Sequence, residues 1–526
     1  MALQTFLKNQ TEKIQNIEKV SLMAWWNLAT LGDEKFAQEL QDAKIAMRQL
    51  FSNSEDYQFL LSQPKTQDPL VNRQVTLLLH SYRENQIPQE LIKEISTLET
   101  EVESIYTNFR PIIKDKPVSN NDLKKILVES KNSADRQEAW EASKLIGEQV
   151  ESNVLTLIKL RNESATKAGF KDFYSMSLEL QELDQTRLFK LLNELEQATN
   201  AHWKQYKEQL DTSLAEHFGI STDALKPWHY QDPFFQEAPK QKIDLDSLYV
   251  GKDIVEMSRA FYEAIGLPAD DVIARSDLFE RDKKSQHAFC SCLDRKQDVR
   301  ILCNLRDNEF WMSVQLHELG HAVYDKYIDA KLPFLLRTPP HTSTTEASAM
   351  LFGRFSKDGD FLQRYVGISS QKATELDAQT RNQNAANLLV FARWALVMIH
   401  FEQAMYQQPG IDLNRFWWDC VERFQGVKRV KGRNKPDWAS KLHLACAPVY
   451  YQNYVLGELT ASQLFHCLQR RLKARNEHFN TSKDVGHFLK TRLYSLGAQH
   501  PWEETLQHAT GETLNPHYFS LDVQMT

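Results

Sequence analysis

Two histidines and a glutamate between residues 314 and 324 have the spacing of a zinc site. The segment reads His317-Glu318-x-x-His321. On a helix, side chains four residues apart lie on one face with Cβ atoms about 5–6 Å apart, so two imidazoles at this spacing can bind one zinc ion. Glu318 directly follows the first histidine and suits a base acting on metal-activated water better than a ligand. The segment predicts zinc ligands at His317 and His321 and a catalytic base at Glu318.

The predicted third ligand is Glu346, early on a second helix. The proline-containing segment 332–341 ends the zinc helix, and a new helical pattern begins near residue 342. A helix that begins there can cross the zinc helix, and a glutamate in its first turns can then complete the metal site. Two alternatives are open: Ser343 and Glu346 form a capping box, or the two histidines are core residues satisfied by their neighbours.

Long helices are predicted to position these side chains. The chain of 526 residues has only 17 Gly and 17 Pro, which favours helices over a strand-and-turn architecture. Apolar stripes at helical spacing run through residues 1–110, where a layer of helices could roof a cleft. Phe310, Val314 and Tyr324 continue such a stripe along the zinc helix. We expect one domain over 1–526, predominantly all-α, with the zinc core at 286–351.

Residues 286–305 are the exception to the helical pattern. Apolar positions alternate with others from Val299 to Leu305, and residues 286–292 precede them across a polar turn at 294–298. This pattern predicts a small antiparallel sheet next to the zinc helix. Its open edge could pair with an extended peptide by strand addition. The alternative is a structural hairpin with a covered edge.

Two further segments contain candidate binding residues. Between residues 441 and 454, one lysine, one histidine and three tyrosines cluster. So many polar tips favour a donor cluster facing a cleft over core packing. Segment 227–235 is aromatic and bounded by prolines, so we interpret it as irregular. It either lines a pocket or packs as a loop.

Composition argues against several other classes of protein. The net charge of −7 gives no reason to expect nucleic-acid binding, and the basic run 428–435 is interpreted as a solvated loop. The N-terminus lacks the pattern of a signal peptide. The most apolar stretch, 387–400, is interrupted by Arg393 and is too short to span a bilayer. With six scattered cysteines interpreted as reduced thiols, we expect a cytoplasmic monomer or homodimer without nucleic-acid or membrane partners.

Taken together, these segments resemble the angiotensin-converting-enzyme family of gluzincin zinc peptidases over most of the chain. The zinc segment followed by Glu346 is similar to the family's metal segment. His287 and Ala288 resemble its edge-strand pair that grips the substrate backbone. The segment ending in Gln231 resembles the one that supplies its carboxylate-binding glutamine, and Lys441, His443 and Tyr450 are similar to its distal cluster.

The resemblance implies a large helical body with a deep central channel, Zn²⁺ as cofactor and short peptides as substrates. Glu318 would take a proton from zinc-bound water, while His443 and Tyr454 would stabilise the substrate carbonyl. Lys441, Tyr450 and Gln231 would bind a C-terminal carboxylate. The predicted function is a zinc peptidase of the peptidyl-dipeptidase type, which releases C-terminal dipeptides.

Three positions depart from the family pattern. Strict spacing places the family's mechanistic tyrosine at Asn453, and a one-residue shift puts it at Tyr454. A chloride-binding arginine of animal members is Gln452 here, and an aspartate that supports a zinc histidine is Met350.

Two other functions remain open. The segment 451–459 also resembles the thimet-oligopeptidase family, so an oligoendopeptidase is one alternative. The other is a non-catalytic, zinc-stabilised helical scaffold that binds peptides. Glu318 argues against the scaffold, because a structural zinc site needs no base beside the metal.

Overall fold

Helices dominate the computed structural model, which describes residues 2–239 and 243–525. Within these residues, the strands form two antiparallel two-stranded sheets, so the prediction of a predominantly all-α fold is confirmed. The chain divides into two compact units, each assembled from separate segments. Unit 1 contains residues 2–86, 243–380 and 456–519, and unit 2 contains residues 87–239, 381–455 and 520–525. The expected single domain and central channel stay predictions.

Unit 1 contains the N-terminal helices, the predicted zinc core and most of the C-terminal segment. Its elements are α1 (Leu3–Leu31), α2 (Glu34–Phe51), α3 (Ser54–Leu61), α4 (Pro69–Glu84), α10 (Asp246–Tyr249), α11 (Ile254–Ala264), α12 (Asp270–Arg275), β3 (Phe289–Cys292), β4 (Val299–Leu302), α13 (Glu309–Lys326), α14 (Thr342–Gly353), α15 (Gly359–Phe361), α20 (Lys483–Arg492) and α21 (Trp502–Thr510). Short 3₁₀ or π turns connect several of them.

Unit 2 is built around two long helices, α7 and α9. Its elements are α5 (Gln89–Asn108), β1 (Ile112–Ile113), β2 (Lys116–Pro117), α6 (Asn120–Glu129), α7 (Ser133–Lys167), α8 (Phe173–Leu180), α9 (Gln185–Phe218), α17 (Leu413–Gln425) and α18 (Leu442–Cys446). Three helices, α16 (Ser370–Gln407), α19 (Tyr451–Lys473) and α22 (His517–Asp522), contain residues of both units.

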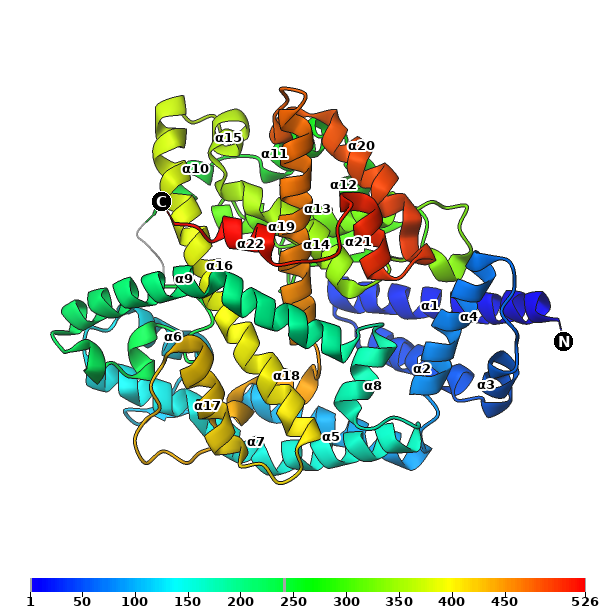
Figure 1. Cartoon of the computed structure of the whole chain (residues 1–526), viewed down its shortest axis with the longest axis horizontal. Helices are drawn as coiled ribbons and strands as arrows, with labels where there is room; N and C mark the ends of the chain where they lie inside the picture. Colours follow the sequence, from blue (N-terminus) through cyan, green and yellow to red (C-terminus); the bar gives the residue numbers. More distant parts are fainter. Residues whose placement is uncertain (1, 240–242, 526) are drawn as a thin grey trace. The chain divides into compact units, whose positions relative to one another are not determined.

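Local signals explain where the helices begin and end. Asn132 caps α7 by accepting a hydrogen bond from the Ala134 amide, and Asp184 caps α9. Gly32 ends α1 in the left-handed conformation, and its amide bonds the Leu28 carbonyl. The chain then turns back, so α1 and α2 lie side by side (Figure 1).

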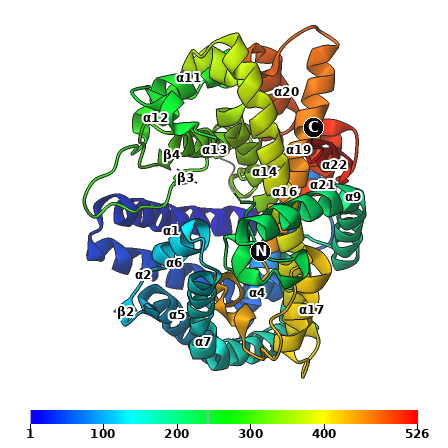
Figure 2. The same ribbon diagram turned by 90° about the vertical axis from the view of Figure 1, so that its left-hand side faces the viewer.

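The β3–β4 hairpin lies between helices of unit 1. Phe289 pairs with Leu302 and Cys292 with Val299 in antiparallel register. On one face, Leu302 and Leu293 pack with Trp26 of α1. Figure 2 shows β3 and β4 beside α12 and α13. The hairpin was predicted over 286–305, and the strands themselves are shorter than that range.

Helix α16 corrects one argument made from the sequence. Among the described residues, α16 is the helix that is long enough and apolar enough to cross a membrane. However, 83% of its most apolar 18-residue stretch is buried inside the protein. Arg393 does not interrupt the helix, because its buried guanidinium donates to Thr199 Oγ1 at 2.9 Å and lies over the Trp203 ring. The length argument was therefore wrong, and the burial of α16 is that of a core helix.

Candidate active site

The zinc motif lies on α13, which packs closely against α14. A Cβ atom at Gly320 would lie 2.7 Å from the Ala349 Cα and 2.9 Å from the Ser348 carbonyl oxygen. The glycine therefore lets the two helix backbones approach. Ser348 Oγ donates to the Gly320 carbonyl at 2.9 Å and fixes the crossing. Phe310, expected to continue the buried stripe, is 60% exposed, so the inward face of α13 begins after it.

This crossing brings the three predicted metal ligands together. One ligand atom each of His317, His321 and Glu346 lies within 4.8 Å of the others, and each histidine Nε2 is 3.9 Å from Glu346 Oε2. No other group of three such ligands occurs in the described part of the chain. His341 caps α14 by accepting from the Ser343 amide, so the capping-box alternative for Glu346 is wrong.

The charges of the cluster suit a divalent cation. Burial lowers the pKa of His317 to about 4, and burial together with His317 lowers the pKa of His321 to about 3, so both imidazoles are neutral ligands near pH 7. Burial and the charge of Glu458 raise the pKa of Glu346 to about 7. Two neutral imidazoles and one carboxylate form the donor set of a catalytic zinc site, so these residues fit the predicted zinc.

Thr345 contacts the second histidine, His321. This contact was not predicted from the sequence. Thr345 Oγ1 lies 2.7 Å from His321 Nδ1. If that nitrogen carries the proton, Nε2 keeps its lone pair for a metal. Met350, at the position where the family has an aspartate, lies near Gly457, whose hypothetical Cβ would be 3.2 Å from the Met350 sulfur. The one signal for Thr345 in the sequence is its position before Glu346.

Glu318 is buried beside this cluster. It is 7% exposed. Burial, followed by the charge of Glu346, raises its pKa to about 8. Burial raises the pKa of the Cys290 thiol on β3, and the charges of Asp325 and Glu318 add to this shift. Glu318 therefore lies within electrostatic reach of both the metal cluster and the hairpin.

The outer edge of β3 presents backbone groups that can pair with a peptide. The backbone amide and carbonyl of Ile301 point away from β3. The amide donates to Ser276 Oγ, and the carbonyl accepts from the Asp277 amide. The Cys290–Ile301 pair is thus non-hydrogen-bonded, and alternation along the ladder directs the Cys290 and Cys292 backbones outward. No described strand pairs with this edge. Residues 287 and 288 directly precede β3, with His287 exposed.

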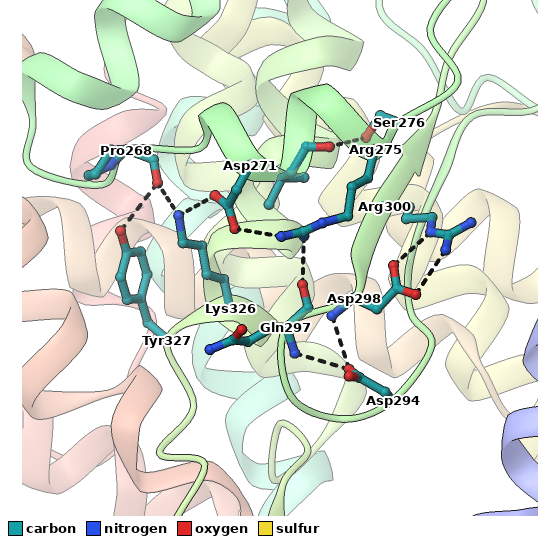
Figure 3. Close-up of polar contacts among 11 residues, drawn as sticks. Pro268, Asp271, Arg275, Ser276, Asp294, Gln297, Asp298, Arg300, Lys326 and Tyr327 are labelled. Carbon is teal, nitrogen blue, oxygen red and sulfur yellow. Dashed lines mark hydrogen bonds and ion pairs between the residues drawn. The ribbon is translucent and has the colours of Figure 1, made fainter.

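A polar network connects the turn of the hairpin to the end of α13 (Figure 3). Lys326 donates to Asp271 at 2.5 Å, and Arg275 donates both to Asp271 at 3.3 Å and to the Gln297 carbonyl at 2.6 Å. Asp294 accepts from the Gln297 and Asp298 amides within the turn. The network holds β3 at a fixed position relative to the zinc helix.

The predicted carboxylate-binding residues lie in unit 2. There, Lys441 contacts Gln236 and not the predicted Gln231. Its ammonium donates to Gln236 Oε1 at 2.7 Å, whereas Gln231 follows the short turn Pro227–Tyr230 with φ of 66°. Lys441 also lies over the rings of Phe234, Trp394 and Tyr451. Burial lowers its pKa to about 8. Gln236 was missed because the sequence of this segment does not show which of its two glutamines, Gln231 or Gln236, contacts Lys441.

The other predicted residues of unit 2 form an aromatic cluster. The Tyr450 and Tyr454 rings are 5.1 Å apart, Tyr451 is 5.6 Å from Tyr454, and the His443 ring is 5.2 Å from Tyr451. Asn453 faces elsewhere and donates to Gln181 at 3.1 Å. Of the two candidates for the mechanistic tyrosine position, Tyr454 is therefore the one that joins this cluster.

Comparison with known proteins gives the family. A family model described as peptidase M2, angiotensin-converting enzyme, matches residues 1–223 and 235–516. Thermostable carboxypeptidase 1 of Pyrococcus furiosus is 21% identical over 256 residues, which cover 42% of this chain and 49% of that protein. The match thus spans about half the length of that curated relative. Because the family model covers nearly all of the sequence, the chain belongs to the angiotensin-converting-enzyme family of peptidases.

Proposed function

We propose that this chain is a zinc-dependent peptidase that hydrolyses short peptides and releases C-terminal dipeptides. One observation carries the proposal: ligand atoms of His317, His321 and Glu346 converge within 4.8 Å, beside the buried carboxyl group of Glu318. Membership of a peptidase family supports the hydrolase class.

The catalytic steps are assigned to residues on α13 and α14. His317, His321 and Glu346 would hold zinc, whose Lewis acidity would activate water and polarise the scissile carbonyl. Glu318 takes a proton from the attacking water and passes it to the leaving amine. The base and two of the ligands share one helix, which supports a fixed geometry between them.

Substrate binding is assigned to two other groups of residues. The outward backbone groups of β3, with His287 and Ala288 before them, would pair with the substrate backbone. Lys441, Tyr450 and Gln236 would bind the C-terminal carboxylate, with Gln236 replacing Gln231 because it already contacts Lys441 at 2.7 Å. His443 and Tyr454 would donate to substrate carbonyls, and one such donor at a developing oxyanion contributes about 2.7–4 kcal/mol.

The cleavage register can be measured with matched peptides. Each peptide of a defined set is digested with a free and with an amidated C-terminus, and the products are identified by mass spectrometry. We expect dipeptide release from the free form and at least about tenfold slower cleavage of the amide, because one lost charged contact is worth on the order of 1.4 kcal/mol or more. Chelator should abolish both reactions.

Other product patterns would redirect the assignment. Release of single residues would favour a carboxypeptidase, in line with the name of the Pyrococcus furiosus relative. Internal cleavage that is indifferent to amidation would favour an oligoendopeptidase. Metal-dependent binding of peptides without any cleavage would contradict the enzyme and favour the scaffold.

A further inference from the structure

Val449, directly before the tyrosine cluster, has an unusual backbone conformation. Its φ is 53°, and its side chain is 1% exposed. The left-handed region is unfavourable for a β-branched residue, because Cβ crowds the following carbonyl oxygen. Such a conformation persists only where surrounding contacts hold it. Local sequence gives no reason for it, so the cause lies in the packing of unit 2.

Three side chains from separate elements hold the Val449 backbone. Glu402 Oε1 on α16 accepts from the Val449 amide at 2.7 Å. Gln452 Nε2 on α19 and Gln181 Nε2 after α8 donate to the Val449 carbonyl oxygen at 2.5 and 3.4 Å. Two distant side chains, Glu402 and Gln181, therefore hold the amide and the carbonyl, and Gln452 adds a local contact to the carbonyl from three residues along the chain.

The buried carboxyl group of Glu402 depends on its hydrogen bond from the Val449 amide. Glu402 is 2% exposed, and burying a carboxyl group is costly unless it is hydrogen-bonded. Burial raises its pKa to about 8, while the Val449 amide and Arg161 act in the opposite direction. Arg161 itself donates to Glu99 and to the Ala445 carbonyl. Among the described residues, Glu402 thus accepts its hydrogen bond from the Val449 amide.

The position of Val449 determines where the tyrosines point. Tyr450 follows it, and the Tyr450 carbonyl accepts from the Asn453 amide at 2.9 Å as α19 begins. Tyr454 contacts the rings of Tyr450 and Tyr451. A different φ at Val449 would therefore redirect the start of α19 and all three rings.

We propose that Glu402 is a positioning residue that holds Val449 in the left-handed conformation and thereby places Tyr450 for recognition of a peptide's C-terminal carboxylate. The carboxylate-binding role rests on the proposed function. The backbone role does not, since it follows from contacts within unit 2.

Hydrogen–deuterium exchange tests the backbone role without any need for catalysis. In full-length protein, fragments covering residues 447–453 are compared among wild type, Glu402→Ala, Glu402→Gln and the control Tyr174→Phe. Tyr174 is buried within electrostatic reach of Glu402, but its hydroxyl has no hydrogen-bond partner among the described residues. We expect at least about tenfold faster exchange in Glu402→Ala, because an amide exchanges when its hydrogen bond opens. Glu402→Gln keeps an acceptor oxygen and should match wild type, as should Tyr174→Phe.

Steady-state kinetics with a free-carboxylate peptide tests the consequence for recognition. Glu402→Ala should raise KM about tenfold with a smaller change in kcat, and should leave the KM of the amidated peptide nearly unchanged. Adding Val449→Gly should recover part of the loss, since glycine adopts positive φ without strain. If Glu402→Ala fails to fold, Gln452→Met removes the shorter of the two hydrogen bonds to the Val449 carbonyl and should raise KM in the same selective way.

Two results would overturn the proposal. One is wild-type exchange at residues 447–453 in Glu402→Ala. The other is an equal loss with free and amidated peptides that Val449→Gly does not relieve. Absence of any cleavage by the zinc-loaded wild type would instead reject the proposed function, and the exchange result would still decide whether Glu402 holds Val449.

Discussion

At the scale of single residues, burial determines which side chains are charged. Lys441 is surrounded by aromatic rings, and its pKa is lowered to about 8 by burial, with Asp232 and Glu237 opposing the shift. Its ammonium is the one positive group assigned to the substrate carboxylate. The ionisation of Lys441 should therefore be visible in substrate affinity.

The prediction concerns KM as a function of pH. A lysine with a lowered pKa is charged below about 8 and loses its proton as pH rises through that value, so KM for free-carboxylate peptides should rise above pH 8 by up to about tenfold per unit. Lys441→Arg is the matched control, because guanidinium stays charged throughout and KM should stay flat. A constant KM from pH 7 to about 9.5, or an equal rise with amidated peptides, would contradict the assignment.

Residue types could be predicted from the sequence more readily than their partners. The two-histidine motif and Glu346 needed only helical periodicity and one stop signal, and the structure brings these residues together. Thr345 and Gln236 could not be predicted in the same way. The Thr345 contact depends on how α14 crosses α13, and the Gln236 contact depends on the path of an irregular segment; neither residue belongs to a spacing motif.

At the scale of elements, the metal cluster depends on the close crossing of α13 and α14. A side chain at residue 320 would meet backbone atoms of α14, which cannot move aside alone. The sequence predicted both helices and the hairpin between 286 and 305, because periodicity and prolines mark them. It could not predict the role of Gly320, since a glycine inside a helix has no local signature of a close approach.

Gly320→Ala should therefore weaken zinc binding. Overpacking of this kind costs about 1–3 kcal/mol, and separation of the helices moves Glu346 away from the histidines. We expect at least about tenfold weaker zinc affinity, measured by competition with a chromogenic chelator. In the control Gly367→Ala, a Cβ meets nothing within 4 Å at φ of +85°, so stability should fall while zinc affinity stays unchanged. Wild-type affinity in Gly320→Ala would show that the crossing does not set the metal site.

At the scale of the whole molecule, the chain divides into two units assembled from separate segments, and the sequence did not predict where their boundaries lie. Helices α16, α19 and α22 contain residues of both units, so three of the boundaries fall inside helices and not in linkers. The predicted N-terminal layer 1–110 is divided as well, because α1 to α4 belong to unit 1 and α5 to unit 2. Helical class follows from composition, whereas the grouping of helices follows from contacts between distant segments.

Zinc content and peptide cleavage, measured together in wild type and Glu318→Gln, test most directly whether a zinc site with Glu318 as base hydrolyses peptides. Both proteins should bind one zinc ion per chain, because Glu318 is not among the three ligands. Wild type should release C-terminal dipeptides, lose activity with chelator and regain it with zinc. Glu318→Gln should be slower by about 10²–10⁴-fold, the usual contribution of a general base. Full activity in zinc-loaded Glu318→Gln, or undiminished cleavage by metal-free wild type, would contradict zinc-dependent hydrolysis with Glu318 as the base.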